Sequence, residues 1–326
     1  MAAQSVQCQL CPRHCRLKNG ERGFCRVRIN IDGKLQTLVY GNPCSINIDP
    51  IEKKPFYHVL PGSGTFSLAT AGCNLRCKYC QNWQISQYPP EDLQNYKLSP
   101  EEIVHDALKN KCQSIAYTYT DPVIFYEYVL DTAKIARKNG LLNILVSAGY
   151  IEQAPLIELC ENVDAIKIDF KGITEEFYRD MCSATLKPVL EAITTIKKQD
   201  VWLELTNLVV PTWNDDEKDL RALCRWTIDN VGTNVPMHFS RFWPTHQLKN
   251  LPPTPEKTII RARQIALDEG IFFAYTGNIM DNEGNNTYCP NDKKLLVRRQ
   301  GYLVLENNIV DGKCKFCQTK IPGIWL

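Results

Sequence analysis

Short apolar segments alternate with longer amphipathic ones between Gly62 and Asp281. This alternation is the sequence pattern of repeated βα units, which form a parallel sheet covered by helices. In a barrel of this kind, ligands bind at the carboxyl ends of the strands. The predicted strands are Thr65–Thr70, Ser114–Thr120, Leu142–Ser147, Ala165–Phe170, Val201–Val210, Met237–Phe242 and Phe272–Thr276, and the clearest predicted helices are Pro122–Asn139, Asp215–Asn230 and Pro255–Asp268.

Three cysteines follow the first predicted strand directly, in the spacing C-x3-C-x2-C: Cys73, Cys77 and Cys80. A 4Fe–4S cluster normally takes four thiolates, and this run offers three. The fourth iron would then be open to a ligand that is not a protein side chain. An open iron favours chemistry on a bound molecule over simple electron carrying. The alternative is that three unrelated cysteines share this spacing by coincidence.

The run C-x3-C-x-aromatic-C after a first strand resembles the radical S-adenosylmethionine (SAM) superfamily. With Pro61–Gly64 before it and Gln81-Asn82-Trp83 after it, the stretch is similar to relatives of pyruvate formate-lyase activating enzyme. Within that group it looks like the radical SAM proteins of the AmmeMemoRadiSam system. The resemblance covers nearly the whole chain and implies an α/β fold, the partial (β/α)6 TIM-like barrel of radical SAM enzymes, with small cysteine-rich segments at both ends.

The same resemblance implies a reaction. SAM would chelate the open iron, and reductive cleavage would yield methionine and a 5′-deoxyadenosyl radical that abstracts hydrogen from an unactivated C–H bond. Reduced flavodoxin or ferredoxin is the implied electron donor. The implied substrate is either a glycine in a partner protein, another peptide or a small molecule, and AMME-domain and Memo-like proteins are implied partners. A non-catalytic structural metal protein is the alternative from a different class.

Further SAM-contacting residues are implied beside the cluster and at strand ends. Residues 117–122 read Tyr-Thr-Tyr-Thr-Asp-Pro, similar to a Tyr-Thr-x-Glu-Pro motif that contacts the amine of SAM. Asp121 stands at the acidic position, and an N-cap role explains it equally well. The residues of this group are Tyr79 and Asn82 on the adenine side, Thr118, Thr120 and Asp121 at the amine, and Ser147 at the end of the third strand.

Charged and polar residues also mark the later strand ends. Asp169 and Lys171 lie on one face of the fourth strand, where burial requires that they pair with each other or meet a charged ligand. They match an Asp-x-Lys motif that approaches the ribose and carboxylate of SAM. Asn214 lies in a turn similar to another SAM-proximal motif, and a turn or cap role is its alternative. His238 matches a SAM-contacting histidine and is a candidate catalytic residue; its alternative is a core histidine.

The first segment, residues 1–61, contains Cys8, Cys11, Cys15 and Cys25. Four thiolates at these separations can form a zinc site or hold an additional iron–sulfur cluster, and the spacing does not distinguish them. A segment with so little apolar material needs such a cross-link to fold. The alternative is a set of reduced thiols without a ligand.

The last segment, residues 282–326, resembles a zinc knuckle across a hairpin. Its candidate ligands are Cys289, Asp292, Cys314 and Cys317, with Asp292 where relatives usually have a cysteine. A carboxylate can bind zinc. The alternative is a degenerate knuckle without metal. Residues 62–281 between the two cysteine-rich segments are the expected barrel domain.

A formal net charge of +2 on 326 residues gives no electrostatic reason to expect binding to nucleic acid or to an anionic membrane. The first residues lack the charged and apolar regions of a signal peptide, and no apolar run is long enough to span a bilayer. Clustered cysteines without a secretion signal favour metal binding over disulfides. We therefore expect a cytoplasmic protein, and an exposed cluster favours an anaerobic host.

Overall fold

A computed structural model describes residues 5–279 and 283–325. The centre of the fold is an eight-stranded sheet in which neighbouring strands follow one another in the chain. Seven of the strands are parallel and the edge strand β5 is antiparallel to β6. The strands are β5 (Pro43–Pro50), β6 (Gly64–Thr70), β7 (Ser114–Tyr117), β8 (Leu142–Ser147), β9 (Ala165–Asp169), β10 (Trp202–Val209), β11 (Met237–Arg241) and β12 (Ala274–Gly277). This architecture confirms the predicted α/β class and the parallel sheet.

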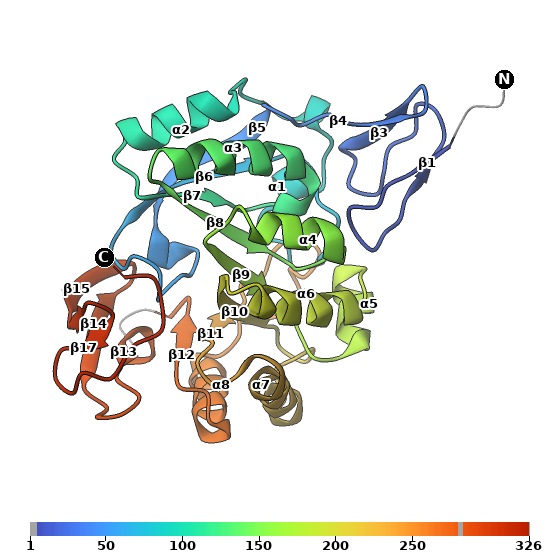
Figure 1. Ribbon diagram of the computed structural model, residues 1–326. Coiled ribbons are helices and arrows are strands. Elements are labelled where there is room, and N and C mark those ends of the chain that lie inside the picture. Colours follow the sequence, from blue (N-terminus) through green and yellow to red (C-terminus); the bar gives the residue numbers. More distant parts are fainter. Residues whose placement is uncertain (1–4, 280–282, 326) are drawn as a thin grey trace.

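Helices α2 to α8 follow the outer side of the curved sheet (Figure 1). Apolar side chains between these helices and the strands form the largest buried cluster of the protein. The other, cavity-facing side of the sheet carries the polar residues described below. The helices are α1 (Trp83–Ser86), α2 (Pro100–Lys109), α3 (Tyr126–Lys138), α4 (Gln153–Cys160), α5 (Glu175–Cys182), α6 (Lys187–Lys198), α7 (Glu217–Val231) and α8 (Glu256–Glu269).

Local sequence signals account for several helix ends. Ser99 and Glu102 form a reciprocal capping box at the start of α2, with Pro100 in the first turn. The expected helix over 122–139 begins instead as a 3-10 turn at Pro122–Phe125, and α3 continues from it. Gly270 ends α8 in the left-handed conformation, as predicted from the Glu269-Gly270 pair.

The two cysteine-rich segments lie on different sides of the sheet (Figure 1). The N-terminal segment contains β1 (Val6–Gln7), β2 (Arg16–Leu17), β3 (Arg28–Ile31) and β4 (Lys34–Thr37), and the C-terminal segment contains β13 (Thr287–Tyr288), β14 (Leu295–Gln300), β15 (Leu303–Asn307), β16 (Ile309–Val310) and β17 (Lys313–Cys314). Strand β5 joins the central sheet although it precedes residue 62, where we expected the barrel domain to begin. The other expected boundary, 281/282, lies outside the described residues.

Among the described residues, none of the helices combines the length and apolar character that crossing a membrane requires.

Candidate active site

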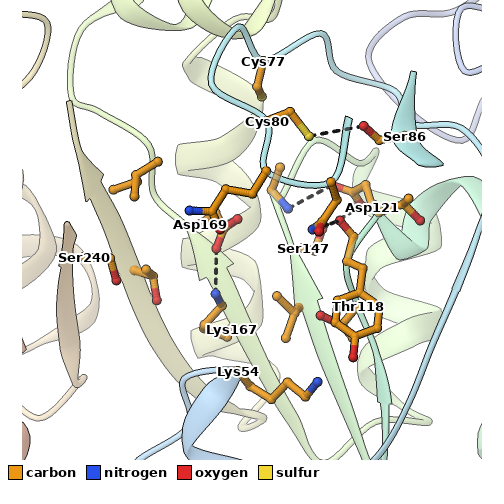
Figure 2. Close-up of a pocket in the computed structure, with 18 of the residues that line it drawn as sticks. Lys54, Cys77, Cys80, Ser86, Thr118, Asp121, Ser147, Lys167, Asp169 and Ser240 are labelled. Carbon is orange, nitrogen blue, oxygen red and sulfur yellow. Dashed lines mark hydrogen bonds and ion pairs between the residues drawn. The ribbon is translucent and has the colours of Figure 1, made fainter. Parts of the chain in front are cut away.

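A cavity of about 430 Å³ opens at the carboxyl ends of strands β6 to β11. Figure 2 shows Cys77 and Cys80 at one end of this cavity and Lys54 at the opposite end. The three-cysteine motif lines this cavity. So does every SAM-contacting residue expected from the sequence except Asn214 and His238. Those that line it are Cys73, Cys77, Cys80, Tyr79, Asn82, Thr118, Thr120, Asp121, Ser147, Asp169 and Lys171.

The three cysteines lie on the loop that follows β6. Burial raises the pKa of the Cys73 and Cys80 thiols, whereas the pKa of Cys77 is raised first by its hydrogen bond with the neighbouring Cys182 and then by burial. Thiolates in such a site need a positively charged group to neutralise them, which an iron–sulfur cluster supplies. Among the described residues, a group in the C-terminal segment has ligand atoms that all lie within 4.8 Å of one another. The three motif cysteines do not form such a group. The set therefore fits a multi-iron group better than a single ion.

Cys182, at the end of α5, is a fourth thiol near the motif that sequence reasoning missed. Its sulfur lies 3.2 Å from the Tyr79 hydroxyl and within hydrogen-bond reach of the Cys77 thiol. It lies behind Cys77 and does not line the cavity. The side of the motif that faces the cavity is therefore bordered by polar side chains and not by another cysteine.

Asp121 combines the two roles that the sequence left open. Its carboxylate caps the turn after β7 by accepting the Val123 N–H at 3.1 Å. It also accepts the Ser147 hydroxyl at 3.0 Å and the Ala148 N–H at 2.9 Å, which ties β7 to the end of β8. Burial raises its pKa. The carboxyl is thus held rigidly at the cavity wall, near Cys73.

Three alternating charged residues form a row along β9 and just beyond its end. The Lys167 ammonium lies 2.7 Å from Asp169, and the Lys171 ammonium lies 3.2 Å from the other oxygen of the same carboxylate. Burial alone would raise the pKa of Asp169, but the two ammonium groups hold it well below its usual range. One carboxylate between two cations leaves a net positive charge here. Lys167 was not predicted, although it shares the strand alternation that singled out Asp169 and Lys171.

Two expected cofactor-binding residues do not reach the cavity. Asn214 is buried and donates to the carbonyl groups of Lys171 and Leu208, at 2.7 and 3.0 Å, so it supports the Lys171 backbone. The His238 ring is buried, and its Nε2 lies 2.6 Å from Glu204. Its immediate contacts are therefore structural. This agrees with the alternative given above, in which His238 is a core histidine.

The far end of the cavity contains lysines that no sequence motif indicated. Lys53 and Lys54 follow β5 and reach the cavity. Asp49 binds both, Lys53 at 2.8 Å, and it also accepts the Tyr119 hydroxyl. Burial lowers the pKa of Lys54 to about 8, against the opposing effect of Asp49. These residues lie in the segment between β5 and β6, and only the tertiary fold brings them to the cavity.

The four candidate ligands of the C-terminal segment converge as expected. One ligand atom from each of Cys289, Asp292, Cys314 and Cys317 lies within 4.8 Å of the others. Cys289 and Cys314 are fully buried, and the sulfur atoms of Cys289 and Cys317 are 3.5 Å apart. This spacing fits one tetrahedral ion with short metal–sulfur bonds. The four N-terminal cysteines surround a second, smaller cavity.

Comparison with known proteins gives the family. Residues 67–224 match the radical SAM superfamily. The chain is 47% identical to the uncharacterized protein MJ0808 of Methanocaldococcus jannaschii over 97% of this chain and 95% of that protein. It is 24% identical to pyruvate formate-lyase 1-activating enzyme of Escherichia coli, over 48% of this chain and 66% of that enzyme.

A putative glycyl-radical enzyme activating enzyme of the same archaeon, MJ1632, is 25% identical over 63% of this chain and 78% of that protein. Among solved structures, a radical SAM methyltransferase from Sphaerobacter thermophilus shares the fold, with a TM-score of 0.54 and 14% identity over 70% of this chain and 68% of that one. The cysteine loop lies at the carboxyl end of β6, inside the matched region. The chain belongs to the radical SAM superfamily.

Proposed function

We propose that this protein is a radical SAM enzyme that binds a 4Fe–4S cluster at Cys73, Cys77 and Cys80 and cleaves SAM reductively. The observation that carries the proposal is the single cavity in which these three thiols face Asp121 and the row Lys167–Asp169–Lys171. When bound, the cluster would supply the electron that splits SAM into methionine and a 5′-deoxyadenosyl radical. The remaining requirements, which are binding, orientation and exclusion of water, are met by protein side chains.

The charges along the wall suit the zwitterionic methionyl part of SAM. Asp121 is a carboxyl group suited to the amino group, and its three hydrogen bonds prevent it from turning away. Lys171, whose pKa is raised well above its usual value by Asp169 despite burial, supplies a permanent cation for a carboxylate. Asp169 keeps two accepting oxygens at the cavity, where they can bind ribose hydroxyl groups. Tyr79 and Asn82 border the same space.

For the substrate, we propose abstraction of hydrogen from a glycine Cα of a partner protein, because two relatives are named as a pyruvate formate-lyase activating enzyme and a putative glycyl-radical enzyme activating enzyme. A reduced flavodoxin or ferredoxin would supply the electron. A second candidate is an anionic small molecule or peptide. It is favoured by Lys54 and Lys167, which place buried positive charge at the end of the cavity away from the cysteines (Figure 2).

The experiment is anaerobic. The protein is reconstituted with iron and sulfide, reduced, mixed with SAM and assayed for 5′-deoxyadenosine by chromatography. Cys77→Ala is the test variant, and Cys112→Ala is the matched control because Cys112 is also buried but lies outside both cavities. We expect product from the wild type and the control and none from Cys77→Ala. Absence of product in a wild type that binds iron would refute the proposal.

We also propose that Cys289, Asp292, Cys314 and Cys317 hold a structural zinc ion. The support is their spacing and the small apolar cluster around them, which is too limited to order the segment alone. Such a site contributes directly to folding. Metal analysis of the wild type and of Cys314→Ala tests it, and a wild type free of zinc after growth in zinc would contradict it.

A further inference from the structure

The N-terminal cysteines surround a cavity that is built at the back of the active-site loop. Cys8, Cys11, Cys15 and Cys25 all line it, together with Asn74 of that loop. The four thiols therefore converge on one small space.

The distances between the thiols distinguish the two kinds of metal site within this protein. Among residues 5–279 and 283–325, the C-terminal group is the set whose ligand atoms all lie within 4.8 Å of one another. Neither the N-terminal cysteines nor the motif cysteines Cys73, Cys77 and Cys80 form such a set. A cluster of four irons holds its thiolates farther apart than one ion does, because each thiolate binds a different iron. The N-terminal site, like the site of Cys73, Cys77 and Cys80, therefore lacks the tight spacing of the zinc-like group.

A buried cation also points to an anionic group in this cavity. Arg28 lines it and is only 5% exposed. Two of its nitrogens bind the Glu127 carboxylate at 2.7 and 2.5 Å, but its Nε is buried without a hydrogen-bond partner in the described structure. A buried donor without a partner is costly. A cluster held by four thiolates is an anion and would satisfy this donor.

The two cysteine loops are in direct contact. Asn74 follows Cys73 immediately, and its carboxamide lies 3.9 Å from the Cys73 sulfur and within hydrogen-bond reach of the Cys11 thiol. Gly72 has a φ of +87°, and a Cβ there would lie 2.4 Å from the Cys25 carbonyl oxygen. Only glycine permits this approach. One residue thus separates the two sets of thiols, with no room for solvent between the loops at Gly72.

We propose that Cys8, Cys11, Cys15 and Cys25 hold a second 4Fe–4S cluster that relays electrons to the cluster at the active site. A reduced low-potential protein of the flavodoxin or ferredoxin class gives up one electron and is oxidised. The N-terminal cluster is reduced by that electron and then reoxidised as it passes to the active-site cluster. No proton or bond is exchanged in the relay. Its role as a relay rests on the proposed function; the presence of the second cluster does not.

The presence of the second cluster is tested without enzyme activity. The variant Cys73→Ala/Cys77→Ala/Cys80→Ala lacks the active-site ligands and keeps the N-terminal four. After anaerobic reconstitution we expect about eight irons in the wild type and about four in this variant, at four irons per cluster, with matching labile sulfide. The electron paramagnetic resonance signal of the reduced variant should not change when SAM is added. Zinc without sulfide, or no metal, at the N-terminal site would overturn the proposal.

The relay is tested with Cys11→Ala/Cys25→Ala, and Cys44→Ala is the control because Cys44 lines neither cavity. We expect the double variant to retain the active-site cluster and to lose the rapid reduction of that cluster by a reduced flavodoxin or ferredoxin. An unchanged rate would refute the relay. Circular dichroism melting confirms that the variant is folded, and the three-cysteine variant tests the site independently. If the wild type yields no 5′-deoxyadenosine, the proposed function fails while the iron count still reports the second cluster.

Discussion

Glu204 is the residue whose replacement gives the sharpest test of how this fold is stabilised below the active-site cavity. It lies on β10 and is completely buried. One carboxylate oxygen accepts the His58 N–H at 2.9 Å and the Trp202 indole N–H at 3.1 Å, and the other accepts the Tyr57 N–H at 3.0 Å. The second oxygen also lies 2.6 Å from the His238 ring. The carboxylate thus joins the chain before β6 to two neighbouring strands of the sheet.

The size of the effect follows from the pKa. Burial alone would raise the pKa of Glu204, but hydrogen bonding to His238 and the nearby donors lower it from 4.5 to about 2. A shift of this size corresponds to about 3 kcal/mol of folding free energy at neutral pH. Glu204→Gln keeps the shape but replaces one oxygen by an NH₂ group that faces other donors. We expect the free energy of unfolding to fall by about 3 kcal/mol, the lower end of the range for breaking a buried charged partner.

The assay is urea unfolding followed by tryptophan fluorescence, with every variant in the same cofactor state because bound groups raise apparent stability. Glu269→Gln is the matched control. Its carboxylate binds Arg221 and Arg225 at the surface between α7 and α8, where ion pairs contribute little. A loss below about 1 kcal/mol for Glu204→Gln, or an equal loss in the control, would refute the reasoning.

The pH dependence has a definite sign. Because the folded-state pKa of Glu204 is depressed, its contribution is fully present above the unfolded value of 4.5 and is lost as the pH falls toward 2. The difference between wild type and Glu204→Gln should therefore be constant from pH 7 to pH 5 and shrink below pH 4.5. A difference that grows on acidification would contradict the assigned charge state.

Three further predictions concern the sites. Asp121→Asn should weaken SAM binding in equilibrium dialysis and cost about 1–3 kcal/mol of stability, because backbone donors lose a charged acceptor; a loss no larger than that of Ser147→Ala would contradict this. His238→Gln should reduce 5′-deoxyadenosine formation by less than about threefold, under 1 kcal/mol in the barrier, because its ring is bonded to Glu204 and does not line the cavity; a larger loss in folded protein would restore its catalytic assignment. Cys314→Ala should remove about one zinc per chain and lower the melting temperature, whereas a variant that retains zinc would disprove its role as a ligand.

Much of the fold was predictable because its signals are local. Apolar runs of strand length separated by amphipathic segments specify alternating strands and helices, and the right-handed βα rule then orders the sheet. The predicted strands all exist, with ends displaced by a few residues. Strand β5 was not predicted as part of the sheet, since Pro43–Pro50 pairs antiparallel with β6 and is only partly buried. Its membership depends on a long-range pairing that no local pattern encodes.

In the candidate site too, some features were predictable from local sequence patterns and others were not. The three-cysteine motif and the alternation around Asp169 are periodic or closely spaced patterns, and the strand-end rule correctly placed these residues at one cavity. Asn214 follows the carboxyl end of β10 and His238 is the second residue of β11, and their side chains bind backbone carbonyls and Glu204 outside the cavity. The position of a residue along a strand is readable from sequence, but the partner of its side chain is not.

The sequence by itself determined the class of fold, and it predicted the cysteine ligands and the end of the sheet where they lie, because these depend on spacing along one chain. Tertiary structure alone decided which distant groups meet: Lys54 with the far end of the cavity, Cys182 with Cys77, and Asn74 between two sets of thiols. It also brought the four C-terminal ligand atoms within 4.8 Å of one another. The physical reason is that metal chemistry depends on distances between atoms, and those distances are set by how loops pack, not by how many residues lie between them.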